Sequence, residues 1–298
     1  MEYYITTEEL AEKKYLILPK TFDWDLVDQE LGFGKIFEIV PEEIYLQIKS
    51  SIDIGQKEIF RLLTKAAVHY SFVLSISKIK VHINNTGINQ FEQDKLKPAP
   101  WWDVRDLGLS LLKFADKLFS DSLDKIAVVP ELKSRIPFFQ NVSEHISKPS
   151  EFESIYSINY SPEVFVMLQR FLKQALMLKV YENIKPGCVD QIKDNPELYV
   201  FFKDAIVFYS LYYASLLPSF IFLQNAVVVQ YEELPWQKSQ VLDSDAKIQS
   251  GKNFLQLAND SLKVISDFMK DHSSEFPCYT GPEPDRIIQS RPSGIYLT

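Results

Sequence analysis

The chain has 298 residues, of which 46% are hydrophobic, and it carries a formal net charge of −8. This length favours two domains over one. The acidic balance argues against nonspecific nucleic-acid binding by the chain as a whole, and a total of only 9 glycines argues against a glycine-rich cofactor fold.

The first half of the chain predicts a turn, two helices, a β-hairpin and a third helix. The first of these helices has a weak apolar stripe that Gly32 and Gly34 interrupt. The hairpin is indicated by alternating β-branched residues that turn at Asn and Gly. In chain order the elements lie at 6–13, 21–39, 57–77, 78–93 and after Pro100-Trp101.

The second half predicts the same order of elements. Its first helix has an explicit start, with Ser161 as N-cap and Pro162 at the first helical position. Its second helix is apolar almost all round, so we expect it to be buried on most sides. The elements lie at 148–155, from Pro162, at 197–217, at 219–233 and through Phe254 to Phe268.

Short phrases repeat between the two halves. They are "GINQFEQ" and "VVVQYEE" at 87–93 and 227–233, and "AAVHYS" and "AIVFYS" at 66–71 and 205–210. Pro-Trp follows both hairpins. We therefore predict a mainly α chain that is a tandem duplication of a helical-bundle module, each with a β-hairpin inserted before its last helix. The predicted parts are an N-terminal module at 1–146, a C-terminal module at 147–275 and an extended proline-rich tail at 276–298.

An uncharged stretch at 205–231 is long enough to span a bilayer. Pro218 splits it, and its counterpart in the first half carries His69, Lys78 and Lys80. Because a membrane span in one half and a charged segment in the other would be inconsistent, we expect a buried helix that breaks into a strand, and no membrane partner.

The two cysteines, Cys188 and Cys278, are far apart in the sequence and have no metal or redox spacing. The two cysteines can form a disulfide, but disulfides are rare in a reducing cytoplasm. We therefore expect two free, inert thiols.

No catalytic or metal-binding pattern is complete. The four histidines have no metal-ligand spacing, "GFGK" at 32–35 is too short for a phosphate loop, and the two Ser-x-x-Lys strings lack companion motifs. We interpret His69 as a half-buried packing residue rather than a base. The prediction is a protein that is not an enzyme, with no catalytic residues, no cofactor and no metal.

Several residues are candidates for an interface with a partner. The tryptophans sit beside prolines, outside the clear helical stripes, where each either caps the core of its own module or anchors a partner. The first hairpin would leave a strand edge for pairing, and the tail is expected to be an arm ordered against a partner. The candidates are Trp101, Trp102, Trp236, Lys78, Lys80, His82, Arg286 and Tyr296.

The chain resembles a family of proteins in phages and prophages of the Bacteroidetes, including crAss-like phages, whose members often carry this module twice. The resemblance rests on "ITTEEL" at 5–10, the paired "AAVHYS" and "AIVFYS" helices, the "QFEQ…PW" and "QYEE…PW" endings and the amphipathic third helix. It covers about residues 5–275. The single module is similar to the head–tail connector, or adaptor, proteins of tailed phages.

The resemblance implies a structural protein of the virion, located in the neck at the head–tail interface and made in the cytoplasm of the bacterial host. Such proteins form a ring, typically of twelve copies, that docks below the portal. The implied partners are other copies of the chain, the portal protein and other neck or tail proteins. Passing DNA would be met only non-specifically, and an acidic chain suits a channel through which DNA slides.

Two other functions stay open. One is a non-enzymatic bacterial helical-repeat adaptor that binds a peptide or a small ligand in an apolar groove between its two modules, near the linker at 137–150. The other is an enzyme that uses a site of unrecognised type.

Overall fold

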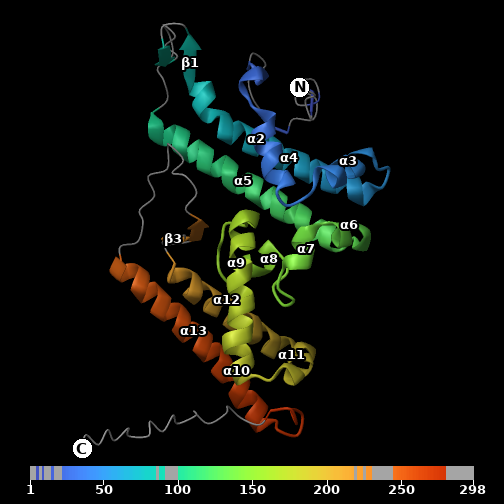
Figure 1. Ribbon diagram of the computed structural model, residues 1–298, viewed down its shortest axis with the longest axis vertical. Coiled ribbons are helices and arrows are strands. Elements are labelled where there is room, and N and C mark those ends of the chain that lie inside the picture. The colour runs from blue at the N-terminus through green and yellow to red at the C-terminus, as the bar shows by residue number, and fades with distance from the viewer. Residues whose placement is uncertain are drawn as a thin grey trace, which may run out of the picture. The chain divides into compact units, whose positions relative to one another are not determined.

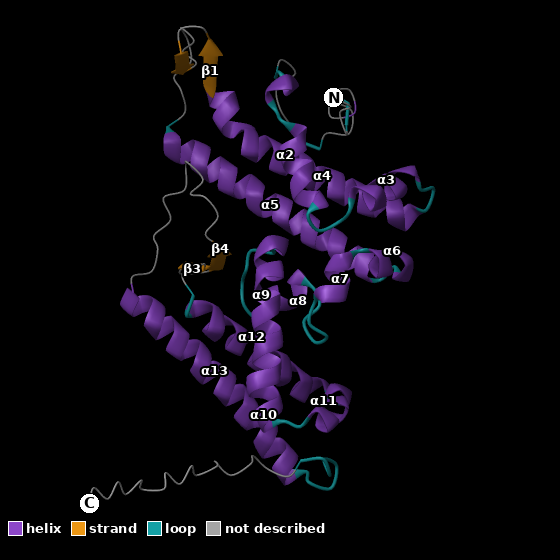
Figure 2. Cartoon of the chain, in the orientation of Figure 1, coloured by secondary structure: helices purple, strands orange, loops and turns teal. Residues whose placement is uncertain are grey.

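The computed structural model describes residues 5–6, 9, 15–16, 22–84, 87–90, 100–217, 220–223, 226–229 and 244–279, without the side chains of 80–90, 101 and 220–229. The described chain is mainly helical, as the sequence predicts (Figure 2). It divides into two compact units, unit 1 with residues 1–170 and 214–250, and unit 2 with residues 171–213 and 251–298. Each unit is a group of residues that contact one another in space and is made of two separate stretches of the chain. The units therefore do not test the module boundaries predicted from the repeat, which stay predictions.

Unit 1 is built around one long helix. This helix, α4, packs against α2 on one side and α5 on another (Figure 1). The side chain of Asp53 caps its start by accepting a hydrogen bond of 2.8 Å from the backbone N–H of Gln56. The helices of this group are η1 (a 3-10 turn, Trp24–Leu26), α2 (Gln29–Phe37), α3 (Glu42–Ser50), α4 (Ile54–Lys80) and α5 (Trp101–Ala127).

The backbones of α2 and α4 lie very close together at Gly32. A Cβ at this position would fall inside the contact distance of Ala67 O and of Ser71 N and Oγ. The Ser71 hydroxyl donates to Ala67 O at 2.8 Å, and Ser75 Oγ accepts from Asp28 N at 2.9 Å. The prediction that glycines interrupt this helix is therefore wrong, because α2 runs through both and one of them lets α4 approach.

Four shorter helices complete the described part of unit 1. Each has a proline at its first position, where the missing N–H costs no intrahelical bond. Ser161 caps the last of them by accepting from Val164 N at 3.4 Å, as the sequence predicts. The buried rings of Phe138 and Phe152 both pack on Phe165. These helices are α6 (Pro130–Arg135), α7 (Pro137–Asn141), α8 (Pro149–Glu153) and α9 (Pro162–Ala175), whose last residues belong to unit 2.

Two short antiparallel strand pairs follow α4 and α12. In the first pair Val81 faces Gln90, and in the second Phe220 faces Val229. The helix before the first pair continues to Lys80, two residues beyond the predicted start of the hairpin at 78. That each pair is a hairpin inserted into a repeated module stays a prediction. The strands are β1 (Val81–Asn84), β2 (Gly87–Gln90), β3 (Phe220–Leu223) and β4 (Ala226–Val229).

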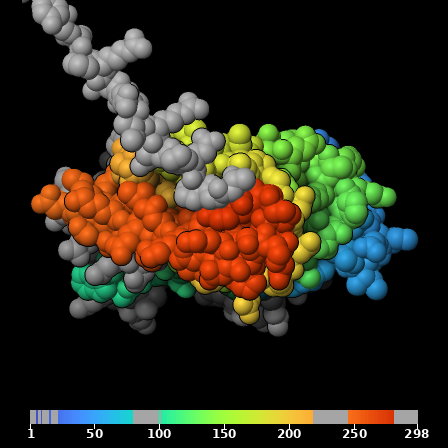
Figure 3. Space-filling model, turned by 90° about the horizontal axis from the view of Figure 1, so that it is seen from below, coloured from blue at the N-terminus to red at the C-terminus, as the bar shows by residue number. Residues whose placement is uncertain are grey.

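Unit 2 contains one buried helix, α12, and one long helix, α13. The helix α13 is drawn in orange and red in Figure 3. The half-exposed apolar residues of this helix include Leu257 and Val264. The elements are η2 (a π-helical turn, Leu176–Val180), α10 (Tyr181–Asn183), η3 (a 3-10 turn, Pro186–Cys188), α11 (Val189–Asp194), α12 (Pro196–Ser215) and α13 (Ser244–Asp271), whose first residues belong to unit 1.

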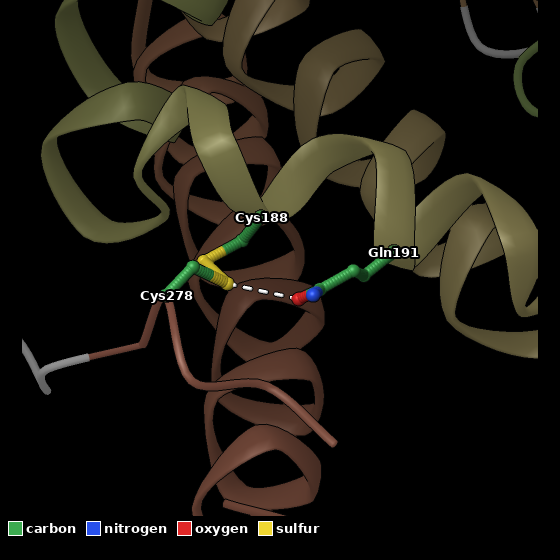
Figure 4. Close-up of a disulfide and its surroundings, with 3 residues drawn as sticks. All are labelled: Cys188, Gln191 and Cys278. Atoms are coloured by element: carbon green, nitrogen blue, oxygen red, sulfur yellow. Dashed lines mark hydrogen bonds between the residues drawn. A yellow bond between two sulfur atoms is a disulfide. The ribbon is translucent and has the colours of Figure 1, made fainter. Parts of the chain in front are cut away.

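A disulfide joins Cys188 to Cys278 within unit 2 (Figure 4). The two Cα atoms are 5.5 Å apart, although 90 residues separate them in the sequence. Oε1 of Gln191 lies 3.0 Å from Sγ of Cys278. The prediction of two free thiols is wrong, because the turn after α13 returns to the start of α11, which spacing in the sequence does not reveal.

One described helix, α4, is long and apolar enough by length and composition to cross a membrane, and most of its apolar stretch is buried inside unit 1. Core helices of globular units meet the same test. The uncharged stretch at 205–231 does not form a single helix, because α12 ends at Ser215 and β3 begins at Phe220.

Candidate functional site

Unit 1 contains a cavity of about 590 Å³ between α2, α4, α5, α7 and α9. This volume lies within the range of small-molecule and peptide side-chain pockets. Most of its wall is apolar, and a few polar side chains converge on it. The apolar residues include Phe37, Ile39, Phe119, Phe138, Val166 and Met167, and the ionisable ones are Lys35, Glu38, Tyr70, Asp116 and Glu163.

The strongest polar contact of the cavity joins α4 to α5. The hydroxyl of buried Tyr70 donates a hydrogen bond of 2.5 Å to Oδ1 of Asp116, which is half-buried. Burial raises the pKa of Asp116 to about 7, although the hydrogen bond from Tyr70 and the charge of Lys35 both act to lower it. Burial also raises the pKa of Tyr70 well above 10. Tyr70 therefore remains a donor while the charge of Asp116 changes near neutral pH.

An ion pair joins α2 to α9 across the same cavity. Lys35 Nζ lies 2.8 Å from Glu163 Oε2, and each side chain is about one third exposed. The charge of Glu163 also acts to raise the pKa of Asp116, against the effect of Lys35. The two members of the pair thus shift the pKa of Asp116 in opposite directions, and each has a smaller effect than burial.

These groups can hold a polar or cationic group at one side of an apolar ligand. Asp116 and Glu163 supply carboxylate acceptors, and Lys35 and Tyr70 supply donors. Among the residues that the structure describes, no three His, Cys, Asp or Glu side chains are grouped as metal ligands would be.

His69 lies on α4 outside this cavity. Its Nδ1 is 2.7 Å from Lys65 O, and its ring packs on Phe114 with centroids 5.1 Å apart. Burial lowers its pKa, so the imidazole is neutral near pH 7. These contacts are those of a packing residue, and His69 is buried rather than half-buried.

Unit 2 contains a second tyrosine that is equivalent to Tyr70. Its hydroxyl, on Tyr209 of α12, donates a hydrogen bond of 2.6 Å to Oδ1 of Asn259 on α13. Tyr70 and Tyr209 occupy the same place in "AAVHYS" and "AIVFYS". Their partners are equivalent as well, because Asp116 and Asn259 each lie fifteen residues after the first residue of α5 and of α13. The structure therefore repeats a specific contact between two helices.

A protein-family model described as "Family of unknown function (DUF6712)" matches residues 35–124 and 168–286. The chain belongs to this family. The first DUF6712 segment contains Tyr70 and Asp116, and the second contains Tyr209 and Asn259, which fits an internal duplication. Comparison with curated proteins and with solved structures gives no match.

The interface candidates from the sequence do not gather at this cavity, as far as the structure describes them. Lys78 forms an ion pair of 2.7 Å with Asp28. Trp102 is half exposed, and with Trp101 it forms the first turn of α5. The side chains of Trp101, Lys80 and His82, and the whole of Trp236, Arg286 and Tyr296, lie outside the described residues, and their roles stay predictions.

Tyr70, Asp116, Lys35 and Glu163 were not predicted as site residues. A signal for Tyr70 was present, because it lies inside the matched phrase "AAVHYS". Asp116 had no such signal, because an alignment on Pro-Trp places it opposite Gly251 and not opposite Asn259. The ion pair had no such signal, because 128 residues separate its members.

Proposed function

We propose that this chain is a structural subunit of the head–tail connector ring in the neck of a tailed phage, made in the cytoplasm of the bacterial host. It docks below the portal and is not an enzyme. The observation that supports the proposal is the tyrosine hydrogen bond between two long helices, which occurs once in each DUF6712 segment.

Two related modules in one chain suit assembly side by side. In this proposal each module carries a hairpin after a long helix, and a two-stranded sheet has outer edges to which another chain can add. Contacts between two different surfaces of neighbouring subunits close into a ring when the rotation per subunit divides a full turn. The net charge of −8 is compatible with a channel that DNA passes without binding.

The test is native mass spectrometry of the purified full chain, with negative-stain images of the same sample and a pull-down against portal protein from the same phage or prophage. We expect a closed ring of about twelve copies, or a monomer that binds the portal and assembles on it. A monomer that neither binds the portal nor assembles on it would contradict the proposal.

A truncation tests the part of the tail in assembly. The cut belongs after Thr280, because Phe276 is buried and Cys278 forms the disulfide. Loss of residues 281–298 is expected to weaken the ring or its docking and to leave the helical circular dichroism unchanged. Unfolding of the truncated chain would show that these residues belong to the fold.

A second candidate function is favoured by the cavity. An adaptor that binds a peptide or a small ligand needs an apolar pocket near the linker, and Pro137, Phe138, Asn141 and Val142 line this one. A thermal-shift screen of small amines and short peptides, with Asp116→Asn as the matched control, separates the two functions. A monomer with a ligand that stabilises only the parent chain would favour the adaptor.

A further inference from the structure

The charges at the cavity favour a cationic occupant. Its ionisable lining has three carboxyl groups, on Glu38, Asp116 and Glu163, and one ammonium group, on Lys35. The ammonium group is already paired with Glu163 at 2.8 Å, and Tyr70 donates to only one oxygen of Asp116. A guanidinium group, with five N–H donors in a planar fork, can bond two carboxylates at once.

The apolar wall requires an apolar group beside that cation. Phe138 on α7 and Val166 and Met167 on α9 line the cavity together with the two carboxylates. A small hydrophilic cation would leave this wall in contact with water, whereas a side chain of the Ile or Leu type next to the charge would cover it.

The C-terminal segment of this same chain has the matching sequence. Residues 280–298 follow the last described residue, Tyr279, and contain "DRII", in which Arg286 is followed directly by Ile287 and Ile288. Arg286 lies seven residues beyond Tyr279, a stretch that can extend over roughly 25 Å, so it can reach a neighbouring molecule in contact with this one. The internal stretches 91–99 and 230–243 contain no arginine.

We propose that the tail of one copy binds in the cavity of a second copy, with the Arg286 guanidinium between Asp116 and Glu163 and the Ile287 and Ile288 side chains against the apolar wall. The proposal rests on the proposed function only in assigning tail and cavity to different copies. Such a contact joins two different surfaces, so it is of the head-to-tail kind that closes a ring.

The docking would depend on pH through the cavity. A guanidinium beside Asp116 favours its charged form, so docking lowers a pKa that stands at about 7 in the described structure. Binding therefore releases a proton and is weaker below pH 7. The other ionisable groups that line the cavity are Lys35, Glu38, Glu163 and Tyr70, and burial raises the pKa of Tyr70 well above 10.

The test uses the full chain with the photo-cross-linker p-benzoylphenylalanine in place of Ile287. After irradiation, mass spectrometry is expected to find a cross-link to the peptide that contains Met167. Mixing the unlabelled probe chain with an ¹⁵N-labelled parent chain identifies the partner, because a cross-link between unlabelled tail and labelled Met167 peptide joins two copies. The same probe in place of Ile52, which is 89% exposed, is the control for random collision.

Three variants sharpen the test, with the tail substitution made in the probe chain and the cavity and control substitutions made in the labelled partner chain. Arg286→Ala, and separately Asp116→Asn combined with Glu163→Gln, are expected to lower the yield of the Met167 cross-link by about tenfold, because a charge-assisted hydrogen bond is lost. Lys57→Gln changes an exposed lysine away from the cavity and is expected to leave the yield unchanged. A yield unaffected by the first two variants, or equal to that of the control probe, would overturn the inference.

The results also separate this inference from the proposed function. A ring without the Met167 cross-link would support the connector and contradict the binding of the tail in the cavity. A cross-link found only between unlabelled segments would show that the tail binds within its own chain, and would overturn the exchange between copies. Binding between copies without any ring or portal docking would support the site and contradict the connector.

Discussion

The two tyrosine contacts, one in each DUF6712 segment, have the same geometry and different chemistry. Tyr70 donates to Asp116 over 2.5 Å and Tyr209 donates to Asn259 over 2.6 Å. Asp116 is half-buried at a cavity, whereas Asn259 is exposed. An amide cannot ionise near neutral pH, so only the first segment can couple this contact to a change in charge. The tyrosine hydrogen bond is thus present in both segments, but only in the first segment is its acceptor a group that can titrate.

The largest expected difference between the segments comes from the disulfide, which the first segment cannot have because it contains no cysteine. Closing a loop of about 90 residues restricts the unfolded chain by roughly 4 to 5 kcal/mol in the chain-entropy description. We expect a reducing agent to lower the midpoint of thermal unfolding, measured by circular dichroism, through the transition of unit 2.

The matched control is the variant with both Cys188→Ala and Cys278→Ala. Its unfolding should be insensitive to the reducing agent and should resemble that of the reduced parent chain. If the oxidised and reduced parent chains unfold at the same temperature, the disulfide does not stabilise unit 2.

The next effect comes from the burial of Asp116. Its pKa is about 7 when folded and 3.8 in the reference state, so the folded chain keeps a proton that the unfolded chain releases between these values. Stability from this group is therefore highest below about pH 4 and falls as the pH rises to about 7, by up to about 4 kcal/mol. We expect Asp116→Asn to abolish this loss and to raise the free energy of unfolding by urea at pH 8 but not at pH 4.

The second segment supplies the control for this prediction. Asn259→Asp places a carboxyl group in the same hydrogen bond at an exposed position, where burial cannot raise its pKa. The variant should differ from the parent chain by less than about 1 kcal/mol, with little dependence on pH between 5 and 8. A strong pH dependence in Asn259→Asp would show that the contact itself, and not burial, sets the titration.

A third test concerns the close approach of α2 to α4. Gly32→Ala forces a methyl group against the backbone of Ala67 and Ser71, so we expect a loss of about 1 to 3 kcal/mol in the free energy of unfolding. At Gly34 a methyl group would meet nothing within 4 Å, and Gly34→Ala should stabilise the helix by about 0.5 to 1 kcal/mol. Urea unfolding of the two variants measures both changes in the free energy of unfolding. If these changes had the same sign, the close contact at Gly32 would be contradicted.

The main helices could be predicted from the sequence because their signals are local. The long helices were identified from their apolar spacing, and α9 from a serine cap followed by proline. Gly32 was misread because its role depends on α4, which lies 22 residues or more further along the chain and whose approach leaves no mark in the local pattern. From the local sequence, a glycine in a helix is expected to be destabilising because it loses more backbone entropy on folding. Only the packed structure shows that Gly32 also lets the backbone of α4 come close to α2.

The cavity could be predicted only in part. The repeat pointed to Tyr70 through its equivalence with Tyr209, since both lie in matched phrases. Lys35 and Glu163 come together from distant helices, so their pairing depends on the tertiary fold. The disulfide could not be predicted for the same reason, because its two cysteines are 90 residues apart in the sequence and meet only in the folded unit 2.

The smallest expected effect tests how the ion pair tunes Asp116. The positive charge of Lys35 lowers the pKa of this group and the negative charge of Glu163 raises it. We expect Lys35→Gln to move the midpoint of the pH-dependent loss of stability upward and Glu163→Gln to move it downward. The measurement is the free energy of unfolding by urea from pH 4 to 8, with Asp116→Asn as the background in which neither substitution can shift that midpoint. Because Tyr209 and Asn259 have no titrating carboxyl between them, shifts of opposite sign would trace the difference between the two segments to the charges around one cavity.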